Sequence, residues 1–471
     1  MTDILCSDPG RQILEEALTC YGLSDSDTTL IRHNENRTYC VDGKYLLRIH
    51  KHKDGFTTDP LYEGFDRTEL YRSELSFLAY LKKCDMHVQT PVRNKKGCLV
   101  TLLRDGTPAT VLTWLEGHTV DKNELSPALC RKIGAMTAKL HLASRNFPPV
   151  SSIRYDGRMC VRLARKLTDL SKSGLIVSVR YEVLNAALNI IGDFLHAAEN
   201  EFILVHSDLS LSNMLITESG LAPIDFSLSG YSHPMMDIGC LYCVVSGSVH
   251  RHAIAEGYET ASDRKIDFYA VDCLFALNVL LGIILHWESW TKEDWFAKKL
   301  ADWCDHIFGP LAQGKSLIDL SVRAGFAGKE DVDRWLTLVN MVADDFPGLD
   351  REDYTETLKK NIARKTALCV KEDGKIVGAL LFSPNQHCLS CMAVHPDYRR
   401  YGIASALIAE MLRLMPEGDV SVTTFREGDP KGNAPRALYQ RFGFEPDKLL
   451  TEFNYPAQKF VLKRKEKRNI S

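Results

Sequence analysis

The segment His206-Ser-Asp208-Leu-Ser-Leu-Ser-Asn213, followed by Ile224-Asp225-Phe226, decides the fold of the larger part of this chain. Both segments are bounded by apolar runs, which is typical of short strands that end in polar loops. A lone aspartate in a loop is usually a turn residue, but three oxygen-bearing side chains at this spacing are hard to explain as turns. Carboxylate and amide oxygens suit a hard divalent cation. The segment therefore predicts a metal-assisted site for transfer to a hydroxyl group.

Five side chains would supply the parts that phosphoryl transfer needs: an acid to take a proton, metal ligands and a cation on the phosphates. Asp208 is the candidate catalytic carboxylate, and Asn213 and Asp225 are the candidate ligands of Mg²⁺. Arg48, near the end of a predicted strand, would contact the phosphates of a bound nucleotide. Glu74 on the following helix would pair with Arg48. The alternative for Arg48 and Glu74 is that both are ordinary surface residues.

The composition is that of an ordinary globular protein with two or three cores, because 471 residues exceed one domain. Apolar residues make up 45% and charged residues 25% of the chain, and the net charge of −3 gives no global attraction to nucleic acid. Scattered cysteines without a signal peptide predict reduced thiols and a cytoplasmic location. The most apolar stretch, residues 268–287, contains Asp272 and Asn278, so we expect a central helix there and no membrane span.

The periodicity predicts two lobes in the first 312 residues. Residues 29–50 are expected to form three short strands, and a helix follows at about 69–83. The remaining strands of this small β-rich lobe, which extends to about residue 113, are expected at 98–104 and 109–114. A hinge at residues 114–117 leads into a larger, mostly helical lobe that extends to residue 312. Short strands are expected to interrupt it at 202–206, 213–216 and 221–226.

These features resemble the aminoglycoside phosphotransferase family, which also includes choline kinase-like and homoserine kinase-like members. The resemblance covers most of residues 25–300, and it includes Leu47-Arg48-Ile49, the hinge sequence Val111-Leu-Thr-Trp-Leu-Glu-Gly117 and Leu140-His141. It implies a two-lobed protein-kinase-like domain that phosphorylates hydroxyl groups of small molecules with ATP or GTP and Mg²⁺. Within this domain, His206 is expected to brace the catalytic loop, and Asp237 to support it from a buried position.

The sequence departs from that family pattern at two positions without losing a ligand. Ser207 stands in place of the usual glycine of the catalytic loop. Ser227 stands where many members have a glycine after Asp-Phe. The polar turn at residues 34–37 lacks a glycine-rich loop, as it does in many members of the family.

After a predicted linker at residues 309–315, the pattern restarts as a second domain at residues 316–471. A strand is expected at 318–323, and helices at 330–344 and 351–364. Further strands are expected at 366–371, 375–382, 419–425 and 459–463, and another strand is expected to end at Val394. Further helices are expected at 402–414 and 434–442.

The motif Arg399-Arg-Tyr-Gly402-Ile-Ala404 follows the strand that ends at Val394 and opens an amphipathic helix. A helix N-terminus presents backbone N–H groups to an anion, and this suits a pyrophosphate. Gly402 and Ala404 leave room for such a group to approach the backbone.

Together with Asn433-Ala-Pro-Arg-Ala-Leu-Tyr439-Gln-Arg-Phe-Gly-Phe444, this motif resembles the GCN5-related N-acetyltransferase (GNAT) family. The resemblance implies a GNAT-fold α/β domain with a mixed, mostly antiparallel sheet, and acetyl-CoA as the donor. Tyr439 would protonate or stabilise the departing CoA thiolate. The general base is left open between His387, a water chain and no base. The residues expected to bind acetyl-CoA are Met392, Val394, Arg399, Arg400, Tyr401, Gly402, Ile403, Ala404 and Asn433.

The chain as a whole is therefore expected to be an α+β protein with two group-transfer sites for small-molecule substrates. Both families contain antibiotic-modifying enzymes, so aminoglycoside modification is one hypothesis. The alternatives are a metabolic kinase and acetyltransferase acting on a sugar, amino alcohol or amino acid, or one domain that binds a ligand without turnover. No nucleic-acid or membrane partner is expected, and the sequence does not indicate an oligomeric state. A polycationic acceptor would need an acidic cleft. The candidates are Asp263, Asp267, Asp272, Asp302 and Asp305, and the alternative is that they belong to solvated helix faces.

Overall fold

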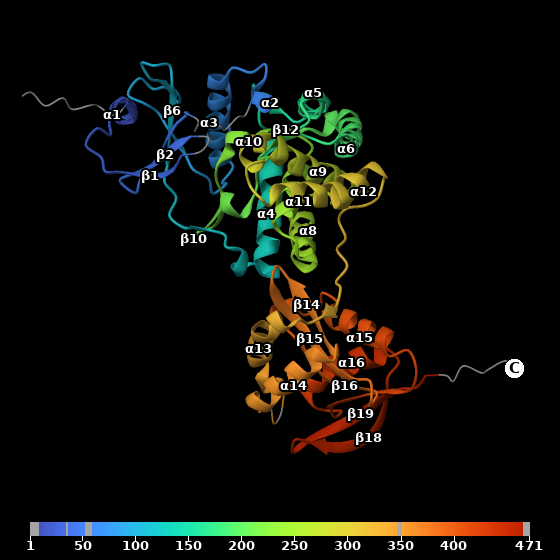
Figure 1. The fold of residues 1–471 in the computed structure, drawn as a ribbon. Coiled ribbons are helices and arrows are strands. Elements are labelled where there is room, and N and C mark those ends of the chain that lie inside the picture. The colour runs from blue at the N-terminus through green and yellow to red at the C-terminus, as the bar shows by residue number, and fades with distance from the viewer. Residues whose placement is uncertain (1–8, 34–35, 52–58, 347, 349, 465–471) are drawn as a thin grey trace, which may run out of the picture. The chain divides into compact units, whose positions relative to one another are not determined.

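The computed structural model describes residues 9–33, 36–51, 59–346, 348 and 350–464 (Figure 1). It divides into two compact units. The first comprises residues 1–125, 129–245 and 254–319, and the second comprises residues 126–128, 246–253 and 320–471. Each unit has its own sheets and its own buried core.

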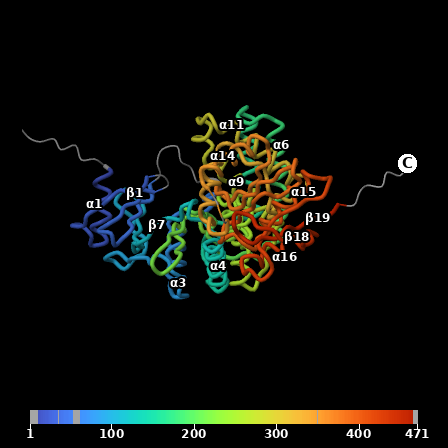
Figure 2. Tube along the Cα trace, turned by 90° about the horizontal axis from the view of Figure 1, so that it is seen from below, coloured from blue at the N-terminus to red at the C-terminus, as the bar shows by residue number. Residues whose placement is uncertain are grey.

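The small lobe of the first unit is an antiparallel sheet between two helices. Its strands are ordered β1 (Thr28–His33), β2 (Arg37–Val41), β3 (Tyr45–Ile49), β6 (Pro108–Thr113) and β4 (Pro91–Val92), and β5 (Thr101–Leu102) also pairs with β6. Helix α1 (Pro9–Tyr21) packs with one face of the sheet and α3 (Arg67–Lys83) with the other (Figures 1 and 2). The three strands expected at 29–50 and the helix are confirmed, whereas the strand expected at 98–104 contains only two residues.

Side chains along a strand alternate between its two faces, and this alternation decides which face of β3 carries Arg48. Leu47 and Ile49 of β3 pack with α1, whereas Leu46 packs with the cluster around α3. Arg48 shares the face of Leu46, so its side chain is directed toward α3.

The larger lobe is mostly helical, with two small sheets. One sheet has the order β11 (Gly220–Pro223), β10 (Met214–Thr217), β7 (His118–Thr119), and the other β8 (Ile153–Arg154), β12 (Gly230–Ser232), β9 (Ile203–Val205). The strands expected at 202–206, 213–216 and 221–226 are therefore present. The long helices are α4 (Pro127–Ser144), α5 (Gly157–Lys172), α6 (Ser178–Ala197), α7 (Met235–Val244), α8 (Ser248–Ala261) and α9 (Phe268–Leu285).

Helix α9 is the one helix among the described residues that is long and apolar enough to cross a membrane, and 61% of its apolar window is buried inside the protein. It packs against α5, α6 and α7 in the larger lobe. Such burial is what a core helix of a large lobe requires.

The second unit is a seven-stranded sheet with two helices on each face. Its order is β13 (Gly325–Phe326), β14 (Ala367–Glu372), β15 (Lys375–Ser383), β16 (Cys388–Val394), β17 (Val420–Phe425), β19 (Tyr455–Leu462), β18 (Glu445–Glu452). Only β16 and β17 are parallel, so the expected mixed, mostly antiparallel sheet is confirmed. Helices α13 (Val332–Met341) and α14 (Arg351–Ala363) pack with one face, and α15 (Ile403–Leu414) and α16 (Asn433–Arg441) pack with the other.

The strand expected at residues 318–323 is absent, and the first part of the expected linker is helical. Residues 309–312 form the short helix α12 (Gly309–Ala312), which continues the helical lobe, and residues 318–323 form no strand. A buried carboxylate on α9 fixes the residues at the start of the expected strand. Asp272 accepts hydrogen bonds from Ser316 Oγ at 3.0 Å and from the backbone N–H groups of Leu317 at 3.0 Å and Ile318 at 2.9 Å. Of these three donors, only the backbone N–H of Ile318 lies within the expected strand, and this bond takes from it a group that strand pairing would use.

The contacts of Asp272 with residues 316–318 predict where the chain can be divided into two stable fragments. Residues 1–312 and 316–471 are expected to unfold cooperatively as separate pieces, but a fragment 1–319 should be more stable than 1–312 by about 1–3 kcal/mol. The shorter fragment leaves Asp272, whose pKa burial already raises, without its three donors. Thermal unfolding of both fragments measures the difference. In an Asp272→Ala background the two fragments should unfold at the same temperature, and a persisting difference would contradict the role of Asp272.

Candidate functional site

The small lobe contributes a buried ion pair to the first site. Arg48 Nη2 on β3 donates a hydrogen bond to Glu74 Oε1 on α3 at 2.8 Å, and both residues are buried. The pKa of Glu74 is raised by burial, and the Arg48 charge opposes that rise. Arg48 Nη1 also lies 3.7 Å from Asp225 Oδ1, so the pair connects the small lobe to the opposite wall of the site. The alternative of two surface residues is therefore wrong.

The larger lobe brings Asp208 and Asn213 into direct contact. Asn213 Nδ2 donates to Asp208 Oδ2 at 2.8 Å and to the Asp208 carbonyl at 2.9 Å. The amide hydrogens are thereby directed at Asp208, so the amide oxygen of Asn213 is the atom suited to a metal. Burial raises the pKa of Asp208 to about 6, the charge of Asp225 adds to that rise, and His206 and the Asn213 hydrogen bond oppose it.

Asp225 completes the set from the loop that follows β11. Its backbone is left-handed, with φ of 63°, which is uncommon for a residue with a side chain. Asp225 Oδ1 accepts from Ser227 Oγ at 2.9 Å, and Oδ2 accepts from Arg32 Nη2 at 3.3 Å. Burial alone would raise the pKa of Asp225, but Arg48, Ser227 and Arg32 together hold it below its ordinary value. Asp225 is thus kept ionised, as a metal ligand must be.

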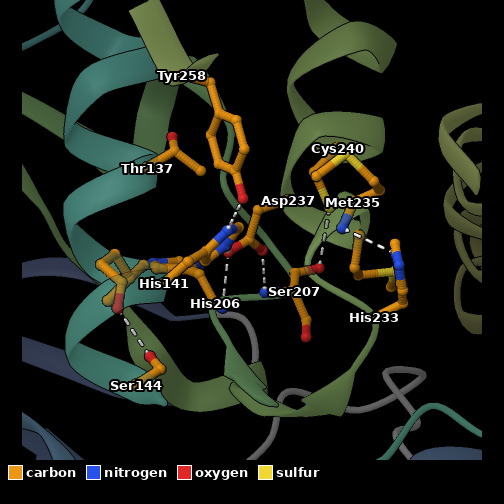
Figure 3. A network of polar contacts seen from close by, with 12 residues as sticks. Thr137, His141, Ser144, His206, Ser207, His233, Met235, Asp237, Cys240 and Tyr258 are labelled. Atoms are coloured by element: carbon orange, nitrogen blue, oxygen red, sulfur yellow. Dashed lines mark hydrogen bonds and ion pairs between the residues drawn. The ribbon is translucent and has the colours of Figure 1, made fainter. Parts of the chain in front are cut away.

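The loop that contains His206, Ser207 and Asp208 is held in place by Asp237, as Figure 3 shows for the first two residues. Asp237 Oδ1 accepts from the Ser207 backbone N–H at 2.7 Å, and Oδ2 accepts from the His206 N–H at 3.0 Å. His141 Nε2 lies 2.9 Å from Oδ2, and His141 Nδ1 lies 3.0 Å from the Tyr258 hydroxyl. A carboxylate can only accept, so His141 donates to it. Asp237 therefore supports the loop from a buried position.

His206 braces the same loop and is not positioned as a metal ligand. Its ring nitrogen Nε2 lies 2.9 Å from the carbonyl oxygen of Ile224, the residue before Asp225. Its ring also packs on Phe226, with ring centroids 4.5 Å apart. His206 thus joins the loop of Asp208 to the loop of Asp225.

A hollow of about 550 Å³ lies beside residues 114–118. It is lined by His87, by residues 114–118 and by residues 216–219. His87 Nε2 lies 3.1 Å from the hydroxyl groups of both Thr217 and Ser219. Arg48, Glu74, Asp208, Asn213 and Asp225 do not line this hollow.

In the second unit, Gly402 starts helix α15 with a left-handed φ of 83°. A Cβ built at Gly402 would have no described protein atom within 4 Å, so the space beside this backbone is open. Such a cradle at a helix N-terminus fits the pyrophosphate of a nucleotide cofactor. The side chain of Ile403 is buried in the core, so Ile403 can serve such a group only through its backbone.

Strands β16 and β17 create the second part of this site. They pair only at Cys388–Ser421 and Leu389–Val422 among the described residues, so the strands part toward Val394. Tyr439 of α16 is buried beside this opening, and both burial and the nearby Cys391 raise its pKa. A phenol that stays protonated is suited to donate a proton to a thiolate.

The other residues expected at the acetyl-CoA site occupy the expected elements. Met392 and Val394 are partly buried on β16. Arg399 and Arg400 are exposed in the turn before Gly402, and Arg399 Nη2 lies 3.4 Å from Asp345 Oδ2. Tyr401 and Ala404 flank Gly402 and Ile403. Asn433 is exposed at the first position of α16.

His387 lies at the other end of β16, before its paired residues. It has a positive φ of 47° and packs against Gly418. Four residues of strand, about 13 Å, separate it from Cys391 beside Tyr439. Direct proton transfer from this position to an acceptor at the opening is therefore geometrically unfavourable.

Four of the five acidic residues considered for a polycation cleft, all but Asp305, have local structural partners. Asp263 pairs with Arg145 at 3.0 Å, Asp267 caps α9 by accepting from Ala270 N at 3.1 Å, and Asp302 pairs with Lys299 at 2.8 Å. Asp272 anchors residues 316–318, as described above. These roles do not require a ligand.

Sequence reasoning missed Arg32, the contact of His141 with Asp237, and Tyr354. The Tyr354 hydroxyl accepts a hydrogen bond from Trp335 Nε1 at 2.9 Å. The same hydroxyl lies 3.6 Å from Cys391 Sγ. Each of these contacts joins residues far apart in the chain. The only available signal was the polar character of residues within apolar or strand-like patterns.

The two-lobed fold with Asp208, Asn213, Asp225 and the Arg48–Glu74 pair defines a kinase-like phosphotransferase, and the split sheet with Gly402 defines an acetyltransferase fold. The family model of the phosphotransferase enzyme family matches residues 27–269, and that of the acetyltransferase (GNAT) family matches residues 335–444. The chain belongs to the phosphotransferase enzyme family and carries a GNAT acetyltransferase domain. It is therefore a transferase, and its two domains imply binding of a nucleotide and of acetyl-CoA.

Among curated proteins, the chain is similar to homoserine kinases. That of Methylorubrum populi is 23% identical over 327 residues, which are 66% of this chain and 89% of the relative. That of Janthinobacterium sp. is 25% identical over 42% of this chain and 56% of the relative.

Two solved kinases share the fold of the first part of the chain. The amicoumacin kinase hAmiN has a TM-score of 0.50 and 17% identity over 66% of this chain and 96% of its own. A microcompartment-associated aminopropanol kinase has a TM-score of 0.51 and 20% identity over 66% of this chain and all of its own. At these identities the likeness is one of fold.

Ser207 offers a prediction about strain in the catalytic loop. Its φ is 66°, and its buried hydroxyl has no hydrogen-bond partner among the residues that the structure describes (Figure 3). Ser207→Gly should stabilise the protein by about 1 kcal/mol, because glycine adopts this backbone without strain and removes the hydroxyl. Chemical unfolding measures this. Ser207→Ala, the control, keeps the strained Cβ and should recover at most the hydroxyl part; equal stability of the two variants would contradict the strain argument.

Proposed function

We propose that the first unit transfers the γ-phosphoryl group of ATP or GTP to a hydroxyl group of a small amino alcohol. We further propose that the second unit transfers the acetyl group of acetyl-CoA to an amine. The observation that carries the first proposal is the convergence of Asp208, Asn213 and Asp225 with the buried Arg48–Glu74 pair. A cytoplasmic location belongs to the same proposal, because ATP and acetyl-CoA are intracellular metabolites.

In the proposed kinase reaction, Asp208 accepts the proton of the acceptor hydroxyl and orients it for attack. Arg48, fixed by Glu74, contacts the phosphates. Asn213 through its amide oxygen and Asp225 through its carboxylate would hold Mg²⁺, and these oxygen donors fit that ion. Bound there, Mg²⁺ would neutralise part of the negative charge of the phosphates. Asp237 holds the loop of Asp208, and His206 joins this loop to the loop of Asp225.

The acceptor class is supported by the names of the similar proteins. Homoserine and aminopropanol each carry a hydroxyl group and an amino group. A molecule of this kind offers a hydroxyl to the first unit and an amine to the second, so one substrate could serve both domains. Antibiotic modification, the second candidate, is supported by the fold shared with an amicoumacin kinase. The local pairing of Asp263, Asp267 and Asp302 disfavours a polycationic acceptor.

In the proposed acetyl transfer, the backbone around Gly402 holds the pyrophosphate of acetyl-CoA and the opening between β16 and β17 admits its pantetheine arm. Tyr439 then gives its proton to the departing thiolate. The decisive experiment offers the protein a library of amino alcohols, amino acids, sugars and aminoglycosides with ATP, GTP or acetyl-CoA, each donor added separately. Mass shifts of one phosphoryl or one acetyl group would identify the acceptors. Absence of any shift with either nucleotide would overturn the kinase proposal.

Asp208→Asn should abolish phosphoryl transfer and leave acetyl-CoA binding unchanged, because an amide cannot accept the proton. The variant should also unfold at a higher temperature at pH 7.5. A carboxyl whose folded pKa is raised to about 6 destabilises the fold above that pH, and this cost disappears as the pH falls below its ordinary value. The gain should therefore vanish near pH 4. Near-full phosphoryl transfer by this variant would contradict the catalytic assignment.

The same carboxyl predicts the pH dependence of the kinase reaction. The unprotonated form of Asp208 is the active one, so kcat/KM should fall about tenfold per pH unit as the pH falls below about 6. Acetyl transfer by the same preparation, measured in parallel, is the control, and it should not share this inflection. A kinase profile that stays flat down to pH 4.5 would contradict the role of Asp208.

Gly402→Val and Tyr439→Phe should impair acetyl transfer in separable ways. Valine fills the open space beside Gly402 and cannot easily adopt a φ of 83°, so acetyl-CoA binding itself should weaken. Tyr439→Phe removes one hydroxyl that acts late, so turnover should fall roughly a hundredfold with almost unchanged affinity. Calorimetric titration with acetyl-CoA and a thiol-release assay test both. Unchanged turnover in Tyr439→Phe would leave that residue a packing role only.

A further inference from the structure

Arg32 is a third cation at the kinase site, after Arg48 and any bound metal, and the reaction described above gives it no role. It lies on β1, and its Nη2 atom is 3.3 Å from Asp225 Oδ2. Its side chain is 54% exposed, whereas that of Arg48 is 4% exposed. Arg48 is thus fixed, and Arg32 has room to move on its long side chain.

The hairpin of β1 and β2 directs Arg32 toward the catalytic groups. Arg32 is paired with Thr38, and its neighbour His33 is paired with Arg37. Since successive side chains of a strand point to opposite faces, Arg32 and Thr38 share one face of the hairpin, and His33 and Arg37 share the other. The Arg32 charge also lowers the pKa of both Asp208 and Asp225, as expected for a cation on the inner face.

The contact of Arg32 with Asp225 competes with the expected metal. Asp225 Oδ1 is engaged by Ser227 and faces Arg48, so Oδ2 is the oxygen that Arg32 occupies. Two cations within about 4 Å repel each other strongly in a partly buried site. A metal ion on Asp225 would therefore favour departure of the Arg32 guanidinium from Oδ2.

The hairpin sequence explains why an arginine is needed here. Residues 23–42 contain no glycine, so this hairpin lacks the residue that lets backbone N–H groups approach phosphates closely. A guanidinium group binds phosphate oxygens with two parallel hydrogen bonds and carries a permanent charge. An arginine on the inner face of β1 can supply the contact that the backbone does not.

We propose that Arg32 is a second phosphate-binding residue that is held on Asp225 until nucleotide and metal arrive. Arg32 occupies Oδ2 in the free protein, leaves it when a divalent cation binds Asp225, and then contacts the polyphosphate. This inference rests on the proposed kinase function. It implies that Arg32 weakens the binding of a divalent cation alone and strengthens the binding of the cation–nucleotide complex.

Removal of Arg32 should therefore shift the two affinities in opposite directions. With the full-length protein, Arg32→Gln should bind Mn²⁺ about threefold more tightly in the absence of nucleotide, measured by loss of the free Mn²⁺ signal in electron paramagnetic resonance. The same variant should bind Mg²⁺·AMP-PNP, or its guanine analogue, about tenfold more weakly by calorimetry. Neither measurement depends on turnover.

Arg37→Gln is the matched control, because it removes the same charge from the opposite face of the same hairpin, where Arg37 Nε lies 3.4 Å from His33 Nε2. This variant should leave both affinities within about twofold of the wild type. If Arg32→Gln behaves like the control, or shifts both affinities in one direction while the wild type binds nucleotide, the role of Arg32 is overturned and the kinase proposal stands. If the wild type binds neither nucleotide analogue, both the kinase proposal and this inference are overturned.

Discussion

The kinase site depends on one buried carboxylate, that of Asp237. Its two oxygens receive the backbone N–H groups of His206 and Ser207 and the ring of His141. A buried carboxylate without donors would be strongly unfavourable, so the loop can satisfy Asp237 only in the conformation that it has. That conformation includes the left-handed Ser207 and places Asp208 beside Asn213. The hydrogen bonds to Asp237 therefore hold the strained, left-handed backbone of Ser207 in place.

How much of the site could be predicted depended on the separation of the partners in the sequence. Asp208, Asn213 and Asp225 were predictable because they lie close together in the sequence, in one loop and in the turn that follows the next strands. Arg32 was not, since a polar residue on an edge strand resembles a surface residue and its partner Asp225 lies 193 positions away. His141 was quoted only as part of a helix. The contact that gives each of these residues its role is made by tertiary structure alone.

The same distinction explains the errors in the fold. Strands β14, β15 and β16 were predictable because buried β-branched and aliphatic residues define them. The strand expected at 318–323 is absent, and Asp272 of α9 takes the backbone N–H groups of residues 317 and 318 at its start. Strand β18 was missed because nearly all of its residues are exposed, so its sequence has no apolar alternation. This exposed edge strand is stabilised by backbone hydrogen bonds to β19, and such bonds do not depend on which side chains the strand carries.

The surroundings of the two carboxylates of the kinase site shift their pKa values in opposite directions. Asp225 faces two arginines and a hydroxyl donor, and its pKa is held low despite burial. Asp208 is buried with fewer opposing charges, and the charge of Asp225 adds to the rise of its pKa to about 6. When the pKa values of two neighbouring carboxyl groups are separated in this way, the group with the lower pKa is suited to a metal and the group with the higher pKa to proton transfer.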